Sequence, residues 1–267
     1  MSKEEIVQEK PIAFFDSGAG GLTVLALAAR MLPAENFLYF GDTANAPYGS
    51  KDKEEVRALS LQAAELLVEK GCKALVVACN TATSAAVDLL REKFTLPVIG
   101  MEPAIKPALA EGGKVLVMAT PLTLREKKFR QLYNRYATAT DEVTLLPCPG
   151  LVELIEQGII SGPALENVLT KLFSEVNTKE ITTVVLGCTH YLFIKATLQK
   201  MLPGVKFIDG NLGTVRQLQR VLTAKKLSRS GHKSGGQVEI LASGGEASLD
   251  LLKKLYAIAS AQWEGEV

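Results

Sequence analysis

The stretch ALVVACNTATSAAV, residues 74–87, holds an apolar run that ends abruptly on Cys79 and continues with an amide and a hydroxyl side chain. The apolar run predicts a buried strand, and the residues after it have the spacing of a helix. The stretch TTVVLGCTHYLFI, residues 182–194, repeats this arrangement and leads to Cys188. Two predicted strands therefore each deliver a thiol to the start of the segment that follows.

Strand-like and helix-like segments alternate along the rest of the chain. The expected strands cover residues 11–15, 37–40, 75–78, 98–99, 114–118, 143–146, 181–186, 205–208 and 238–242. The expected helices cover residues 22–31, 51–70, 81–93, 122–136, 151–156, 164–176, 191–201 and 212–222, with one more helix at the C-terminal end. Continuous Val, Leu and Ile runs are typical of strands buried on both faces, as in parallel sheets covered by helices. The predicted fold class is α/β.

The chain carries a loose internal duplication. The offset between Ile12 and Val115, in corresponding strands, is 103 residues, and the offset between the two strand-end cysteines is 109 residues. This predicts two similar three-layer α/β domains with mainly parallel sheets, related by a pseudo-two-fold axis, with the active site in the cleft between them. We expect the first domain to be discontinuous, with residues 1–100 plus 210–267, and the second to cover residues 101–209.

Composition and charge exclude several classes of protein. Hydrophobic residues make up 47% of the chain and charged residues 22%, a balance typical of globular proteins, and the formal net charge is +1. This near-neutral charge argues against nucleic-acid binding, as does the confinement of basic runs to short stretches such as REKKFR. No run approaches the roughly 18 apolar residues of a membrane span, and MSKEEIVQEK does not resemble a secretory signal. We therefore expect a cytoplasmic location without membrane contact.

The four cysteines differ in their expected positions. Cys72 and Cys148 are interpreted as small core residues, and no pair has C-x-x-C spacing. Cys79 and Cys188 are expected at the carboxyl ends of parallel strands, where ligands bind in open α/β sheets. Both precede helices, whose free N–H groups favour negative charge, so we expect their thiols to be shifted towards thiolate.

Two thiols that face one cleft suit one type of reaction. Inversion of a carbon centre through a planar carbanion requires a base on one face and an acid on the other. One ionised and one protonated thiol can exchange these roles with the handedness of the substrate. Asp16 ends a further strand, and the SGAGG sequence after it offers exposed amides. Spacing alone leaves open the alternative that both cysteines are core residues.

Four motifs together resemble the glutamate racemase family, a cofactor-independent branch of the aspartate/glutamate racemase superfamily. They are FDSGAGGLTV at 15–24, GDTANAPYGS at 41–50, ACNTAT at 78–83 and GCTHY at 187–191. The resemblance covers nearly the whole chain, with the motifs in order and at the expected separations. One departure is Gly210, where the family commonly has serine.

The resemblance implies catalytic roles for five residues. Cys79 matches the cysteine that removes the α-proton of D-glutamate, and Cys188 matches the one that removes the α-proton of L-glutamate. Asp16 resembles the carboxylate beside the first cysteine, and His190 resembles the group that assists the second. Glu153, in LVELIE, resembles a further acidic residue near the second cysteine.

The same resemblance implies how the substrate is held. The matching positions, besides Asp16 and His190, are Ser17, Tyr48, Gly49, Asn80, Thr81 and Thr189. None of the four motifs contains an arginine, so neutral amides and hydroxyls are expected to stabilise the carboxylate next to the carbanion. The resemblance further implies the substrates D- and L-glutamate, no cofactor, no metal, supply of D-glutamate for peptidoglycan, and a homodimer.

Alternative interpretations remain open at this stage. Asp16 could cap a helix, and His190 could be structural. The substrate could be aspartate, because the length of the pocket cannot be measured from sequence. Cys79, Cys188 and His190 with an aspartate could form a metal site, although zinc ligands usually come in closer pairs. A partner role towards gyrase is conceivable by resemblance, but the basic residues favour solvated helix faces.

Overall fold

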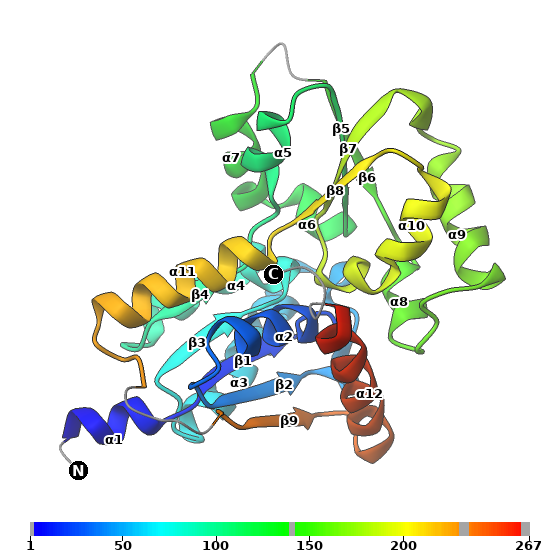
Figure 1. Ribbon diagram of the computed structural model, residues 1–267. Coiled ribbons are helices and arrows are strands. Elements are labelled where there is room, and N and C mark those ends of the chain that lie inside the picture. The colour runs from blue at the N-terminus through cyan, green and yellow to red at the C-terminus, as the bar shows by residue number, and fades with distance from the viewer. Residues whose placement is uncertain (1–2, 139–141, 230–234, 263–267) are drawn as a thin grey trace.

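The strands form two separate parallel sheets in the computed structural model, which describes residues 3–138, 142–229 and 235–262 (Figure 1). The first sheet has the order β4 (Val98–Gly100), β3 (Ala74–Val77), β1 (Ile12–Asp16), β2 (Phe37–Gly41) and β9 (Val238–Ala242). The second has the order β6 (Val143–Pro147), β5 (Lys114–Ala119), β7 (Ile181–Leu186) and β8 (Lys206–Asp209). The predicted α/β class and the predicted strands are confirmed.

The two sheets share one topology. Read from its other edge, the second sheet has the order β8-β7-β5-β6. Each of these strand numbers is four higher than that of the corresponding strand in β4-β3-β1-β2 of the first sheet. The strand before Cys79 and the strand before Cys188 therefore occupy equivalent places, as the internal duplication predicted. β9 has no counterpart in the second sheet and pairs in parallel with β2, with Val238 opposite Phe37. The C-terminal segment thus completes the first sheet.

Helices cover both faces of the sheets. They are α1 (Lys3–Glu9), α2 (Leu22–Met31), α3 (Lys53–Glu69), α4 (Asn80–Lys93), α5 (Ile105–Ala110), α6 (Pro121–Arg125), α7 (Lys127–Tyr136), α8 (Leu151–Ile155), α9 (Pro163–Phe173), α10 (Lys195–Met201), α11 (Asn211–Ala224) and α12 (Glu246–Gln262). Alternate residues of β1 point to opposite faces, so Phe14 packs in the core with α2, while Phe15 packs with α3 and α4. The core that contains Phe14 continues through Met118 into the second sheet.

Several helices differ from the sequence prediction. The expected helix 122–136 is divided into α6 and α7 at Glu126, whose backbone is extended and whose buried carboxylate pairs with Lys53 across 2.6 Å. The expected helix 191–201 begins as a 3-10 helix at Thr189–Ile194 before α10. The short helices α1 and α5 were not predicted. Local periodicity does not report the break at Glu126, where the ion pair with Lys53 is a tertiary contact.

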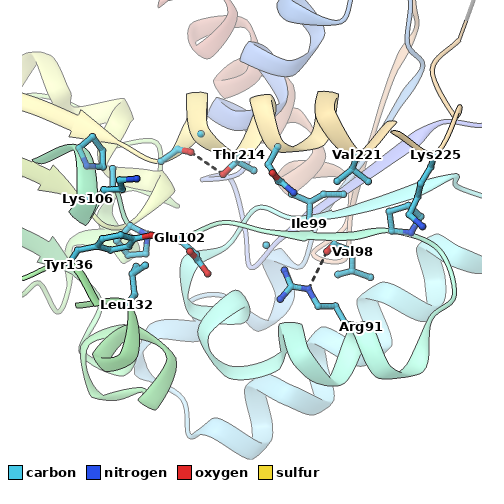
Figure 2. A pocket seen from close by; sticks show the side chains of 18 residues that line it. Arg91, Val98, Ile99, Glu102, Lys106, Leu132, Tyr136, Thr214, Val221 and Lys225 are labelled. Carbon is cyan, nitrogen blue, oxygen red and sulfur yellow. Dashed lines mark hydrogen bonds between the residues drawn. The ribbon is translucent and has the colours of Figure 1, made fainter. Parts of the chain in front are cut away.

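The chain crosses between the two sheets after β4 and again after β8. The crossings approach closely at Gly210, where an added Cβ would lie 2.4 Å from the carbonyl oxygen of Glu102. A side chain at this position would therefore require the two crossings to move apart. A cavity of about 590 Å³ lies beside the crossings. Figure 2 shows Lys106 and Tyr136 on one side of the cavity, and Arg91 on the other.

No helix among residues 3–138, 142–229 and 235–262 is both long and apolar enough to cross a membrane.

A buried ion pair lies at the amino ends of β2 and β3, and it leads to a prediction about stability. Lys73 donates to Glu35 across 2.5 Å, and both side chains are buried. Lys73→Met leaves a buried carboxylate without its counter-charge, so we expect it to destabilise the protein by about 3–5 kcal/mol. The double variant Lys73→Met with Glu35→Met should recover much of this loss. Urea unfolding measures the free energy of unfolding of both variants against wild type.

The control for this prediction is Lys93→Met, which removes an exposed pair with Glu65. Exposed pairs contribute about 0–1 kcal/mol, so this variant should stay close to wild type. Equal stability of Lys73→Met and Lys93→Met would contradict the importance of the buried pair.

Candidate active site

Strand ends from both sheets meet at one place. Asp16 is the last residue of β1, Cys79 follows β3, and Cys188 follows β7. Thr189 donates a hydrogen bond from its hydroxyl to Oδ2 of Asp16 across 3.1 Å, with both side chains buried. This bond joins the 3-10 helix that follows β7 of the second sheet directly to the end of β1 in the first sheet. The predicted site residues Asp16, Cys188 and Thr189 are therefore brought together.

The loop after Asp16 is held by its own hydrogen bonds. Oδ1 of Asp16 accepts from the amide of Gly18 at 2.9 Å and lies 3.4 Å from the hydroxyl of Ser17. The phenol of Tyr39 donates to the carbonyl of Gly18 at 2.7 Å. Burial raises the pKa of Asp16, although the charge of His190 and the Gly18 amide oppose this shift. The loop therefore presents a buried carboxylate in a defined orientation.

Cys79 forms the N-cap of α4, where its sulfur accepts from the amide of Ala82 at 3.4 Å. The sulfur also lies 3.8 Å from the hydroxyl oxygen of Ser17. Burial and the nearby charge of Asp16 raise the pKa of the Cys79 thiol to about 12. The expected shift of Cys79 towards thiolate at the helix start is therefore wrong for the ligand-free protein. The helix amide opposes the shift, but desolvation and the carboxylate outweigh it.

Cys188 has a different neighbour. Its sulfur lies 3.6 Å from Nδ1 of His190, and Nε2 of His190 lies 2.5 Å from Oε1 of Glu156. Burial alone would lower the pKa of His190, but hydrogen bonds and charges from Cys188 and Glu156 hold this pKa well above its usual value. Burial likewise opposes the ionisation of Glu156, and His190 lowers the Glu156 pKa overall. The two side chains form an ion pair beside the second thiol.

Glu156 lies in the site beside His190, and sequence reasoning did not single it out. Besides pairing with His190, its Oε1 accepts from the amide of Ala19 at 2.7 Å, so it also spans the two sheets. Glu153 lies one helical turn earlier, is half-buried, and lines a cavity of about 250 Å³ with Pro47 and Glu156. The sequence LVELIEQ offers two glutamates with nothing in the local pattern to favour either. The catalytic role of Glu153 remains a prediction.

Two glycines permit the close approach of the sheets. A Cβ added at Gly18 would lie 1.9 Å from the carboxylate of Glu156. A Cβ added at Gly20 would lie 2.4 Å from both the imidazole of His190 and the hydroxyl of Thr189. The glycines of SGAGG therefore serve packing between the two halves of the site, in addition to any exposed amides.

The predicted substrate-holding residues lie around the same site. Both polar atoms of the Asn80 side chain are buried and have no hydrogen-bond partner within the described part of the chain. Because buried polar groups are almost always satisfied, this amide points to a ligand. The Thr81 hydroxyl lies 2.9 Å from that of Thr120 and 3.1 Å from that of Thr123. Thr120 and Thr123 belong to the second sheet's α6 segment, and sequence reasoning did not single them out.

Tyr48 and Gly49 lie in a 3-10 turn, Tyr48–Ser50, that reaches the second half of the molecule. The Tyr48 phenol is buried and donates to Asp42 at 2.6 Å. A Cβ at Gly49 would lie 2.7 Å from Cβ of Thr120, so this glycine also marks a close contact between the halves. Within residues 3–138, 142–229 and 235–262, no group of three or more His, Cys, Asp and Glu side chains could hold a metal ion.

The His190–Glu156 pair generates a spectroscopic prediction. Glu156→Gln removes the carboxylate that helps to raise the pKa of His190, so we expect that pKa to fall towards the usual value of about 6.5. Glu153→Gln is the matched control and should leave the His190 pKa unchanged. An NMR titration measures the pKa of His190. The other histidine of the sequence, His232, is replaced by Gln in every protein so that only one imidazole signal remains. An equal shift in both glutamate variants would contradict the assignment of the pair.

Comparison with known proteins places these observations in a family. The family model described as Asp/Glu/Hydantoin racemase matches residues 22–218. A glutamate racemase of Clostridium botulinum (strain Langeland) is 49% identical over 253 residues, which cover 94% of this chain and 98% of that protein. A relative of this identity and coverage shows the family to which the chain belongs.

Solved structures give the same result. A glutamate racemase isoform of Bacillus anthracis has a TM-score of 0.82 and 29% identity, with 94% of each chain covered. The glutamate racemase of Francisella tularensis, in complex with D-glutamate, has a TM-score of 0.80 and 31% identity, covering 97% of this chain and 96% of that one. The Escherichia coli enzyme, in complex with L-glutamate and the activator UDP-MurNAc-ala, has a TM-score of 0.79 and 28% identity, covering 94% and 95%. The chain therefore belongs to the glutamate racemases, cofactor-independent isomerases of the Asp/Glu/hydantoin racemase family.

Proposed function

We propose that this protein interconverts L-glutamate and D-glutamate, with Cys79 and Cys188 as the two acid/base groups. The observation that carries the proposal is the delivery of one thiol from each of two equivalent strand ends to a shared buried site. Such thiols reach opposite faces of an α-carbon bound between them. The relatives crystallised with D-glutamate and with L-glutamate support the choice of substrate.

The two thiols are prepared for different roles. Cys79 is a neutral thiol in the ligand-free protein, because burial and Asp16 raise its pKa. At Cys188, the His190 imidazolium can stabilise a thiolate. In this state, Cys188 takes the α-proton of L-glutamate, a planar carbanion forms, and Cys79 donates its proton to the opposite face. The cycle ends with a Cys188 thiol and a Cys79 thiolate, which is the starting state for D-glutamate.

Neutral groups stabilise the carbanion in this proposal. The unsatisfied amide of Asn80 and the hydroxyls of Ser17 and Thr81 lie around Cys79, where they can bind the substrate's α-carboxylate and amine. Preorganised dipoles in a buried site stabilise developing charge without reorganising. A fixed cation beside Cys79 would lower its pKa and remove the proton that it must donate.

The proposal also covers the division of the chain into domains, the oligomeric state and the use of the product. We infer a first domain of residues 1–100 plus 210–267 and a second of residues 101–209, a division that the strand pairing of the two sheets supports. We further propose a homodimer that acts in the cytoplasm and supplies D-glutamate for peptidoglycan. The resemblance to the glutamate racemases implies each of these points.

Solvent-exchange kinetics test the two-thiol reaction. Wild type should convert each glutamate enantiomer into the other in D₂O without added cofactor, with α-deuterium entering the product. Cys79→Ser and Cys188→Ser should each lose about 10²- to 10⁴-fold in racemisation, because each removes one of the two proton-transfer groups. Mass spectrometry and circular dichroism measure exchange and inversion.

The matched control is Cys72→Ser, which changes a buried thiol at the other end of β3 and should keep its activity. If aspartate exchanged its α-proton as fast as glutamate, the assignment of glutamate as the substrate would be wrong, but the two-thiol reaction would still be supported. Absence of exchange in wild type with either amino acid would overturn the proposed function.

A further inference from the structure

We propose that Asp42 and Ser243 are positioning residues for the reaction: they hold Tyr48, and with it Gly49, at the wall of the substrate site between the two halves. The inference rests on the proposed function, which it deepens. A hydrogen-bond network joins Ser243, just after the strand β9, to the loop after β2. Neither residue touches the proposed acid/base groups.

The centre of the network is the carboxylate of Asp42, which is 4% exposed. Oδ2 accepts from the Tyr48 phenol at 2.6 Å, and Oδ1 accepts from the Ser243 hydroxyl at 2.7 Å. The side-chain amide of Asn45 donates to both oxygens at 3.0 and 3.1 Å. Three neutral donors thus converge on one buried carboxylate, and hydrogen bonds to a charged acceptor are stronger than neutral ones.

Ser243 links this centre to the far end of the chain. It is the first residue after β9, and its hydroxyl oxygen also accepts from the amide of Ala44 at 3.0 Å. Its amide donates to the carbonyl of Gly41 at 3.1 Å, and the amide of Gly244 donates to the Thr43 hydroxyl at 2.9 Å. The pairing of β9 with β2 brings this turn, which leads into α12, beside the loop (Figure 1).

Tyr48 connects the network to the site, because its phenol binds Asp42 and its ring packs in the core near Cys79. Its ring is fully buried in the same core cluster as Cys79 and Leu122. Burial and the hydrogen bond to Asp42 raise the pKa of its phenol, so the hydroxyl stays a donor to the carboxylate. The next residue, Gly49, lies against Thr120 of the second half. A shift of Tyr48 therefore moves the wall that lies between Cys79 and Thr120.

The expected consequence is a specific kinetic effect. Misplacement of binding groups by about 1 Å can cost about 10²-fold in rate, even when the chemical groups are intact. Ser243→Ala removes one donor to Asp42 and the acceptor for Ala44, while it leaves both thiols in place. We expect KM for both glutamate enantiomers to rise by about 5- to 50-fold, with a smaller change in kcat. Ser243→Thr keeps the hydroxyl and should restore much of the affinity.

The matched control is Ser248→Ala. Ser248 lies in the first turn of α12, and its hydroxyl bonds to the carbonyl of Gly244 at 3.3 Å rather than to the loop. Hydrogen exchange of amides 43–50 in the ligand-free protein supplies a readout that does not depend on activity. Exchange should become faster in Ser243→Ala and stay as in wild type in Ser248→Ala. Tyr48→Phe, which removes another of the three donors to Asp42, repeats the test if Ser243→Ala does not fold.

The outcomes separate the two proposals. A wild type that does not racemise glutamate overturns the proposed function, and with it the positioning role for that reaction, whatever the exchange data show. An active wild type with equal KM in Ser243→Ala and Ser248→Ala overturns the positioning role alone. So does a variant that loses thermal stability or amide protection while its KM stays unchanged, because the network would then serve folding only. A raised KM with faster exchange, both rescued by Ser243→Thr, supports the proposal.

Discussion

The hydrogen bond between Thr189 and Asp16 is the contact on which the site depends, because it ties the carboxyl ends of the two sheets together. Glu156 strengthens the same junction by binding the Ala19 amide of one half and His190 of the other. Such bonds need the backbones to approach closely, and only residues without a Cβ at Gly18 and Gly20 leave the space. The junction brings residues more than a hundred positions apart into one buried environment.

Within this environment, topological equivalence does not produce chemical equivalence. Cys79 and Cys188 follow corresponding strands of the same topology, yet one lies beside a carboxylate and the other beside an imidazole paired with a glutamate. Burial strengthens both effects, because solvent does not screen charges there as it does at the surface. The two equivalent strand ends therefore hold thiols with different electrostatic neighbours.

Much of the fold was predictable because it is encoded locally. Continuous apolar strands separated by amphipathic helices indicated parallel sheets, and the spacing of the repeats indicated two of them. The division of the expected helix 122–136 was not predictable, because a tertiary ion pair between Glu126 and Lys53 accompanies the break. The site behaved similarly: motifs marked Cys79 and Cys188, whereas LVELIEQ could not show whether Glu153 or Glu156 reaches His190.

By itself, therefore, the sequence determined the order and class of the elements and which strand ends carry thiols, carboxylates and hydroxyls. These properties follow from periodicity and from residues adjacent along the chain. Only the tertiary structure decided which groups touch, as when Ser243 meets Asp42 or Thr81 meets Thr120. It also decided that burial and Asp16 raise the pKa of Cys79, against the expectation from its helix position. Protonation depends on desolvation and on distant charges, and both arise only when the chain is packed.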